Sequence, residues 1–130
     1  IIMKKKNLTF IIFHLFNFTL ILLYLFPGSI FGYIIYGNFD IQPQITKDFY
    51  ISSNHFYTFS VLGILGIFVY KNCSKIKYFI FYLIFLSIFL ELMHLVIPKR
   101  SFEFSDLFGN FFGIILTIII YVLFKKIKKN

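Results

Sequence analysis

Acidic residues, cysteine and tryptophan are scarce in this chain. Of its 130 residues only five are Asp or Glu, one is Cys and none is Trp. The single cysteine, Cys73, excludes an intramolecular disulfide and a Cys-x-x-Cys metal site. The five acids stand against 13 Lys and Arg, a formal net charge of +8. The lysines cluster beside apolar runs, which indicates membrane topology and anionic headgroups, so we expect no nucleic-acid partner.

Apolar residues dominate the remainder of the composition. They make up 59% of the chain, and the mean hydropathy is +0.86. A soluble domain of this length has too much surface to bury such a share of apolar side chains. Strand patterning and internal repeats are both absent. The sequence therefore predicts an all-α integral membrane protein.

Four apolar runs predict four transmembrane helices within a single domain of residues 1–130. The predicted helices cover residues of about 8–26, 53–70, 76–97 and 106–124. A helix that crosses the bilayer needs about 20 residues, so the second run must use its flanks. The first run follows three lysines, as in a signal peptide, but its length and the lack of an Ala-x-Ala pattern favour an uncleaved helix. Residues 29–54 are expected to form a loop, part of it along the membrane interface.

The basic residues predict the orientation of these helices. Three Lys precede the first helix, one lies in the first loop, three in the second, two basic residues in the third and four in the tail. Four spans therefore place ten positive charges on one side and three on the other. By the positive-inside rule, both termini are expected in the cytoplasm. All five acidic residues then fall on or near the outer side.

This orientation collects polar residues that are distant in the sequence at one depth. The side chains that it brings to the outer end of the bundle are His55, Glu91, His94, Arg100, Asp106 and Asn110. Charge is costly near lipid, so an intramembrane cluster of this kind is usually functional or paired. We therefore predict that these residues form one site.

Helical spacing places further residues on two faces. Ser87, Glu91 and His94 share one face of the third helix, at spacings of four and three. The polar or small stripe of the fourth helix consists of Asp106, Asn110, Gly113 and Thr117. Small residues let helix backbones approach closely, and polar residues can bond between helices. The two stripes are therefore expected to face each other and to pack the helices together.

Arg100 is the only arginine among the thirteen basic residues. Its planar guanidinium can hold a carboxylate or a phosphate through two hydrogen bonds, which an ammonium group cannot do. Where lysine is the default, this geometry suggests a specific role for Arg100.

The same residues resemble the motif of the VanZ-like family of small membrane proteins. The motif positions, spread from about His55 to Thr117, are taken by His55-Phe56, Glu91, Arg100, Asp106, Asn110 and Gly113. The chain departs from the family pattern at Ile51-Ser52, where Asp-Lys is common, at His94, where Gln is usual, and at Thr117, where a second Gly is common. The resemblance implies a multi-pass protein of the bacterial cytoplasmic membrane. The family takes its name from a member linked to teicoplanin resistance in Gram-positive bacteria.

The favoured interpretation of the site is binding of an anionic headgroup or a lipid-linked envelope precursor. Arg100 with Asn110 would hold phosphate, while the two carboxylates would orient the arginine or accept sugar hydroxyls. A structural alternative is a buried ion-pair network of Glu91, Arg100 and Asp106 that fixes the helices. The chain would then serve as a structural subunit of a membrane complex.

A membrane-embedded enzyme that acts on an envelope lipid is the other alternative. His55 and His94 could act with the carboxylates as general acid and base, or as zinc ligands. No His-Glu-x-x-His motif occurs, and no Ser or Cys nucleophile lies in a recognisable setting. We therefore assign no catalytic residues and predict no metal and no cofactor. Membrane lipids are the expected partners, and the sequence does not decide whether the protein forms an oligomer.

Overall fold

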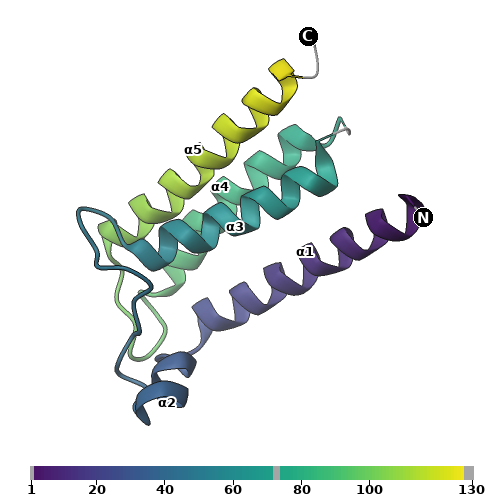
Figure 1. Cartoon of the computed structure of the whole chain (residues 1–130). Helices are drawn as coiled ribbons and strands as arrows, with labels where there is room; N and C mark the ends of the chain where they lie inside the picture. The colour runs from purple at the N-terminus through teal and green to yellow at the C-terminus, as the bar shows by residue number, and fades with distance from the viewer. Residues whose placement is uncertain (1, 72–73, 128–130) are drawn as a thin grey trace.

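The computed structural model is all-helical, as predicted. It describes residues 2–71 and 74–127, with side chains from residue 8 onward. In these ranges the chain forms no strand, and its helices are α1 (Ile2–Leu25), α2 (Ile30–Tyr36), α3 (Ser53–Tyr70), α4 (Ile76–Met93) and α5 (Phe104–Ile127). The four long helices lie roughly along one direction, and α2 lies at one end of them (Figure 1).

Most helix boundaries agree with the sequence, and the exceptions have local causes. α3 covers the predicted residues 53–70, whereas α4 ends at Met93, before the predicted 97. After Met93 the backbone tightens into i→i+3 hydrogen bonds, from His94 N to Glu91 O and from Leu95 N to Leu92 O. Pro98 follows, and the residue before a proline avoids the helical conformation. His94, the residue that ends α4, still lies beside Glu91, with its Nδ1 3.4 Å from Glu91 Oε2.

The segment 29–54, expected to be a loop, contains the short helix α2. The Ser29 hydroxyl accepts a hydrogen bond from Gly32 N at its start. Gly37 ends it with φ +69°, the left-handed conformation that glycine adopts without strain. Phe31, Ile34 and Ile35 of α2 are exposed.

Three helices of the described chain are long and apolar enough to cross a membrane. They are Leu8–Leu25, Ile76–Met93 and Phe104–Ile127. α3 does not belong to this set, because polar residues such as Asn54, His55 and Thr58 occupy its first half. α3 contacts α1, α4 and α5, so much of its surface faces protein. Hydropathy alone thus supports three of the four predicted spans.

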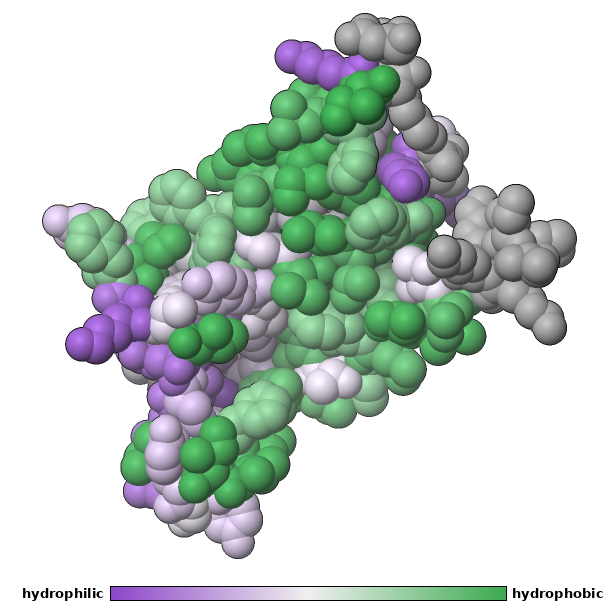
Figure 2. Space-filling view, in the orientation of Figure 1, coloured by the Kyte–Doolittle hydropathy of each residue, from purple (hydrophilic) through white to green (hydrophobic). Residues whose placement is uncertain are grey.

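The outer surface of the long helices is apolar. Phe81 and Phe85 of α4, for example, are 70% and 56% exposed, and Phe112 of α5 is 49% exposed. Figure 2 shows hydrophobic side chains over the middle of the molecule and hydrophilic ones at its ends. This pattern is typical of helices whose outer faces contact lipid.

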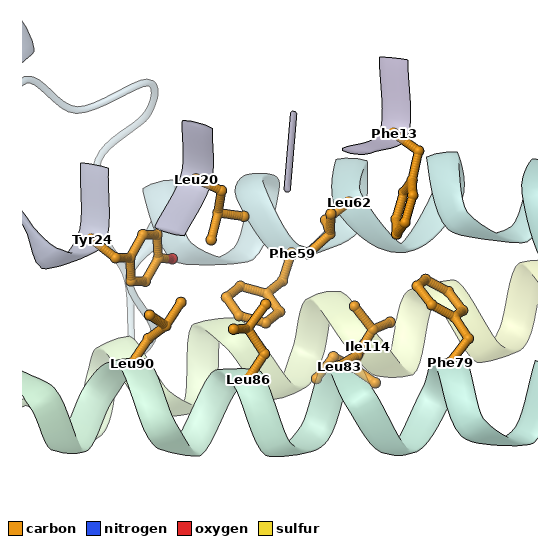
Figure 3. Close-up of a cluster of buried hydrophobic side chains, with 10 residues drawn as sticks. All are labelled: Phe13, Leu20, Tyr24, Phe59, Leu62, Phe79, Leu83, Leu86, Leu90 and Ile114. Atoms are coloured by element: carbon orange, nitrogen blue, oxygen red, sulfur yellow. The ribbon is translucent and has the colours of Figure 1, made fainter. Parts of the chain in front are cut away.

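The interior holds a second set of apolar side chains (Figure 3). Its members come from α1 (Phe13, Leu20, Tyr24), α3 (Phe59, Leu62), α4 (Phe79, Leu83, Leu86, Leu90) and α5 (Ile114). Lipid tails are as apolar as these side chains, so burial from water contributes little to helix association. Close van der Waals packing and bonds between helices must hold the bundle together.

α5 packs most closely on α3. A Cβ added at Gly63 would lie 1.9 Å from the Thr117 hydroxyl oxygen, and one at Gly113 would lie 2.8 Å from Phe56 O. Gly113 and Thr117 of the α5 stripe therefore pack against α3. At the other end of the stripe, Asp106 comes within 4.8 Å of Glu91 on the α4 stripe, as measured between possible metal-ligand atoms. Ser87, on the α4 stripe, is fully buried and donates its hydroxyl hydrogen to Ile84 O in its own helix.

Candidate functional site

The predicted site residues meet at one end of the bundle. α1 and α4 end there, and α3 and α5 begin there, while α1 begins and α5 ends at the opposite end (Figure 1). Glu91, His94 and Asn110 are almost fully buried, with 0%, 2% and 0% of their surfaces exposed. His55, Arg100 and Asp106 are half-buried.

Glu91 joins α4 to the segment that precedes α5. Its Oε1 accepts a hydrogen bond of 3.0 Å from the backbone N–H of Glu103. Its Oε2 lies 3.4 Å from His94 Nδ1 and has no hydrogen-bond partner among the described residues. His94 Nε2 lies 3.0 Å from the carbonyl oxygen of Tyr24, so this nitrogen carries a hydrogen and donates it. The pair thus connects α4 with the end of α1.

His55 forms a second histidine–carboxylate pair with Asp106. Its Nε2 lies 3.3 Å from Asp106 Oδ2, and its Nδ1 lies 3.1 Å from Asn110 Oδ1. Asp106 and Asn110 stand one turn apart on α5, so both reach the same imidazole ring of α3. Asn110 Nδ2 is buried with no hydrogen-bond partner in the described part of the chain.

Tyr24 lies in the site, although it was not among the site residues predicted from the sequence. Its side chain is only 9% exposed, and its hydroxyl donates to Asn110 Oδ1 over 3.2 Å. Its ring stacks on that of His94 at 6.0 Å and meets that of His55 edge-on at 4.9 Å. The spacing of Leu20 and Tyr24 on the buried face of α1 is the sequence signal that could have identified it.

Arg100 does not contact either carboxylate through an ion pair. Its Nε donates to Phe26 O over 3.1 Å and its Nη2 to Leu23 O over 2.9 Å. These carbonyls lie at the end of α1, where helix carbonyls lack intrahelical partners. Burial lowers the pKa of the guanidinium, and the nearby Tyr24, Asp106 and Glu91 groups oppose that shift. The ion pairs of Arg100 with Glu91 and Asp106, expected in the structural alternative, are not formed among the described residues.

The loop that follows α2 covers the N-terminal end of α3. Asn54 donates through Nδ2 to Pro43 O over 2.7 Å and accepts at Oδ1 from Ile45 N over 2.9 Å. Asp48 Oδ1 accepts from Ser53 N over 2.8 Å and so caps the first turn of α3. These bonds hold the loop residues next to the site.

Two cavities adjoin at the cluster. The first, of about 370 Å³, is walled mainly by apolar side chains from α1, α2 and the loop, among them Leu20, Leu23, Phe31, Ile35 and Ile45. The second, of about 270 Å³, is walled mainly by polar and charged side chains, among them Asp48, Ser52, Lys99, Glu103 and Asp106. Both are lined by Gln42, Gln44, Asn54, His55, His94 and Arg100.

The chemistry available here is recognition of charge and hydrogen-bonding groups next to an apolar wall. Lys99 and Arg100 supply positive charge, while His55 and the two glutamines can donate or accept hydrogen bonds. One ligand atom each from His55, Glu91 and Asp106 lie within 4.8 Å of one another, a grouping able to hold a metal ion. The predicted site residues are therefore neighbours, joined by Tyr24 and by residues of the loop.

Comparison with known proteins gives one result. The chain matches the VanZ/LLP1 family model over residues 3–125. The match extends well beyond the motif region of His55 to Thr117 and confirms the resemblance. No curated protein and no solved structure matches the chain. Because the family match covers nearly all of its length, the chain belongs to the VanZ/LLP1 family.

Proposed function

We propose that this protein binds an amphipathic anionic lipid of the bacterial cell envelope at the outer end of its helix bundle. The observation that carries the proposal is the pair of adjoining cavities, one apolar and one polar, that share His55, His94 and Arg100. A lipid has the same division, because its chain is apolar and its headgroup polar. One such molecule could therefore occupy both cavities.

The basic side of the polar cavity is the part suited to an anionic headgroup. Arg100 and Lys99 line it together with the carboxylates of Asp48, Glu103 and Asp106, and both basic residues stand outside the membrane-spanning helices. Two of the five guanidinium donors of Arg100 are bonded to α1 carbonyls, so the others are available to phosphate oxygens. Gln42 and Gln44 add amide groups for sugar or glycerol hydroxyls.

The apolar cavity is suited to the lipid chain. It lies between the end of α1 and α2, and α2 exposes apolar side chains such as Ile34, which is 70% exposed. A short helix that exposes isoleucine and tyrosine side chains in this way fits the membrane interface. A chain that enters from the bilayer would then reach the cavity without crossing water.

The orientation that this function needs is a bundle of four spans with the site on the extracytoplasmic face of the cytoplasmic membrane. α3 has 18 residues, or about 27 Å of helix, close to the thickness of the hydrocarbon core. Its polar first half faces the site, and its neighbours α1, α4 and α5 cover much of the rest. The basic segments at the other end support a cytoplasmic location for both termini.

The proposal is tested by native mass spectrometry of the protein purified in mild detergent. Polyprenyl phosphate, phosphatidylglycerol and the neutral polyprenol are added as separate probes. We expect 1:1 complexes with one or both phosphate lipids and a loss of at least tenfold in affinity with the neutral alcohol. The first two probes distinguish a lipid carrier from an ordinary phospholipid.

Two variants distinguish binding at the proposed headgroup site from a general effect of positive charge on the protein. Arg100→Gln should weaken binding of the phosphate lipid, whereas Lys47→Gln, which removes a charge from an exposed loop position, should not. Circular dichroism confirms that both variants keep the helical fold. Equal binding of the neutral and phosphate lipids, or equal loss in both variants, would reject the proposed headgroup site.

A link to the response to glycopeptide antibiotics is a further part of the proposal, supported by the family membership alone. We expect expression of the protein in a susceptible Gram-positive host to raise the inhibitory concentration of teicoplanin at least twofold. The Arg100→Gln protein, produced at the same level, should not do so. An unchanged inhibitory concentration with the wild-type protein would remove this link.

A further inference from the structure

The three groups that could ligate a metal come from three different helices. His55 lies in the first turn of α3, Glu91 near the end of α4, and Asp106 in the first turn of α5. Metal–ligand bonds of about 2.0–2.2 Å place tetrahedral donors about 3.3–3.6 Å apart. The 3.3 Å between His55 Nε2 and Asp106 Oδ2 already has this value. An ion bound here would connect the outer ends of the three helices.

The orientation of His55 calls for a positive charge between its ring and Asp106. With Asn110 Oδ1 as the acceptor and the imidazole neutral, the ring hydrogen is on Nδ1. Nε2 then presents a lone pair to Asp106 Oδ2, and two acceptors face each other. A metal ion between the two atoms turns this repulsion into two bonds. Asn110 would serve as the outer partner that fixes the ring of a metal-bound histidine.

Glu91 gives a second and independent indication. It is fully buried, yet its Oε2 has no hydrogen-bond partner within the described chain. The nearest group is His94 Nδ1 at 3.4 Å, which is long for a hydrogen bond. A buried carboxylate oxygen without a hydrogen bond is costly, and a coordinated cation would satisfy it.

The charge balance of the cluster points in the same direction. Glu91 and Asp106 bring two carboxylates together, and no Lys or Arg in residues 8–71 and 74–127 forms an ion pair with either. Arg100 directs its Nε and Nη2 to backbone carbonyls instead. A divalent cation would balance the two carboxylates where they are shielded from water.

We propose that His55, Glu91 and Asp106 bind one divalent transition-metal ion between α3, α4 and α5. One imidazole and two carboxylates form a donor set that suits Zn²⁺ or Mn²⁺. Three protein ligands leave at least one coordination position, and the polar cavity beside Asp106 gives a small anionic group access to it. The site does not depend on lipid binding.

The test uses the wild-type protein in detergent, without lipid. Metal content is measured after purification without chelator, and Co²⁺ is then titrated into protein stripped with EDTA. We expect about one metal ion per chain, and visible Co²⁺ absorption bands that saturate at one equivalent and disappear when Zn²⁺ is added. Absence of both the bound metal and the Co²⁺ bands would overturn the proposal. In that case Asn110 would donate through Nδ2 to His55 and leave an ordinary histidine–aspartate hydrogen bond.

Matched variants locate the ion. Asp106→Asn should weaken Co²⁺ binding at least tenfold, while Asp106→His, which restores a ligand, should recover much of it. Asp40→Asn, at an exposed carboxylate paired with Lys99, is the control and should bind as the wild type does. Equal affinity in Asp106→Asn and Asp40→Asn would place the ion elsewhere. If a variant loses its helical circular dichroism, the wild-type titration still decides between the two accounts.

Discussion

Arg100 Nη2 donates a hydrogen bond of 2.9 Å to the carbonyl oxygen of Leu23, although 77 residues separate the two in the sequence. The guanidinium Nε makes a second bond, to Phe26 O. The arginine thus caps the end of α1 from the segment that connects α4 and α5. A planar fork can reach two carbonyls at once, which explains why this position differs from the twelve lysines.

Replacing this arginine should loosen the end of α1. Arg100→Lys keeps the charge but loses one of the two bonds, and we expect a loss of about 1–2 kcal/mol in the free energy of unfolding. Unfolding in mixed micelles, followed by circular dichroism, measures the change. Lys99→Gln is the matched control, because its exposed ion pair with Asp40 should contribute less than about 1 kcal/mol. Equal effects in the two variants would contradict the capping role.

The hydroxyl of Tyr24 should contribute to stability through Asn110. Tyr24→Phe removes the hydrogen bond to Asn110 Oδ1 and leaves the ring contacts with His55 and His94 intact. We expect a loss of about 1 kcal/mol, measured by the same unfolding experiment. Tyr33→Phe, at a tyrosine that is 53% exposed, should change stability by less than about 0.5 kcal/mol. A Tyr24→Phe protein as stable as Tyr33→Phe would show that the bond contributes nothing.

The helices and the members of the site could be predicted because their signals are local or periodic. Long apolar runs mark α1, α4 and α5, and the direction of each helix decides which polar residues reach the same end. Glu91, His94 and Asn110 were predicted at one depth in this way and lie together. Such reasoning needs only helix order and length.

The pairing within the site could not be predicted, because it depends on how each helix is rotated and what lies beside it. The acceptors of Arg100 are backbone carbonyls, and every residue has one, so the sequence cannot indicate which are used. Tyr24 stands near the end of an apolar run, where an interfacial tyrosine is equally common. Gly113 and Thr117 of α5 carry no mark in the sequence that predicts their contact with α3.

The contact between Gly63 and Thr117 should make this position of α3 intolerant of a larger residue. A Cβ at Gly63 would lie 1.9 Å from Thr117 Oγ1, so Gly63→Ala must separate α3 from α5. We expect a loss of about 1–3 kcal/mol, although the same change in an open helix would stabilise it. Thr117→Ala, which removes the two nearest atoms, should recover part of that loss when combined with Gly63→Ala. Strictly additive effects would show that the two residues are not coupled.

The location of α3 decides whether the loop after α2 and the segment before α4 lie on opposite sides of the membrane. Gln44 and Ser101 are exposed at the site end of the bundle, and Ser74 is exposed between α3 and α4. In a Cys73→Ser background, we expect an impermeant maleimide applied to intact cells to label Gln44→Cys and Ser101→Cys. Ser74→Cys should react only after the membrane is permeabilised.

The labelling pattern shows whether α3 spans the membrane, because the two arrangements predict different relative reactivities for Gln44→Cys and Ser74→Cys. If α3 crosses the membrane, Gln44→Cys and Ser74→Cys must differ in reactivity towards the reagent. If α3 lies on one side, the two must react alike, since no span then separates them. Labelling of Ser74→Cys alone in intact cells would keep four spans but reverse their direction, and the site would face the cytoplasm. A soluble extracytoplasmic ligand would then have no access to Arg100, and the proposed function would need an inner-leaflet lipid instead.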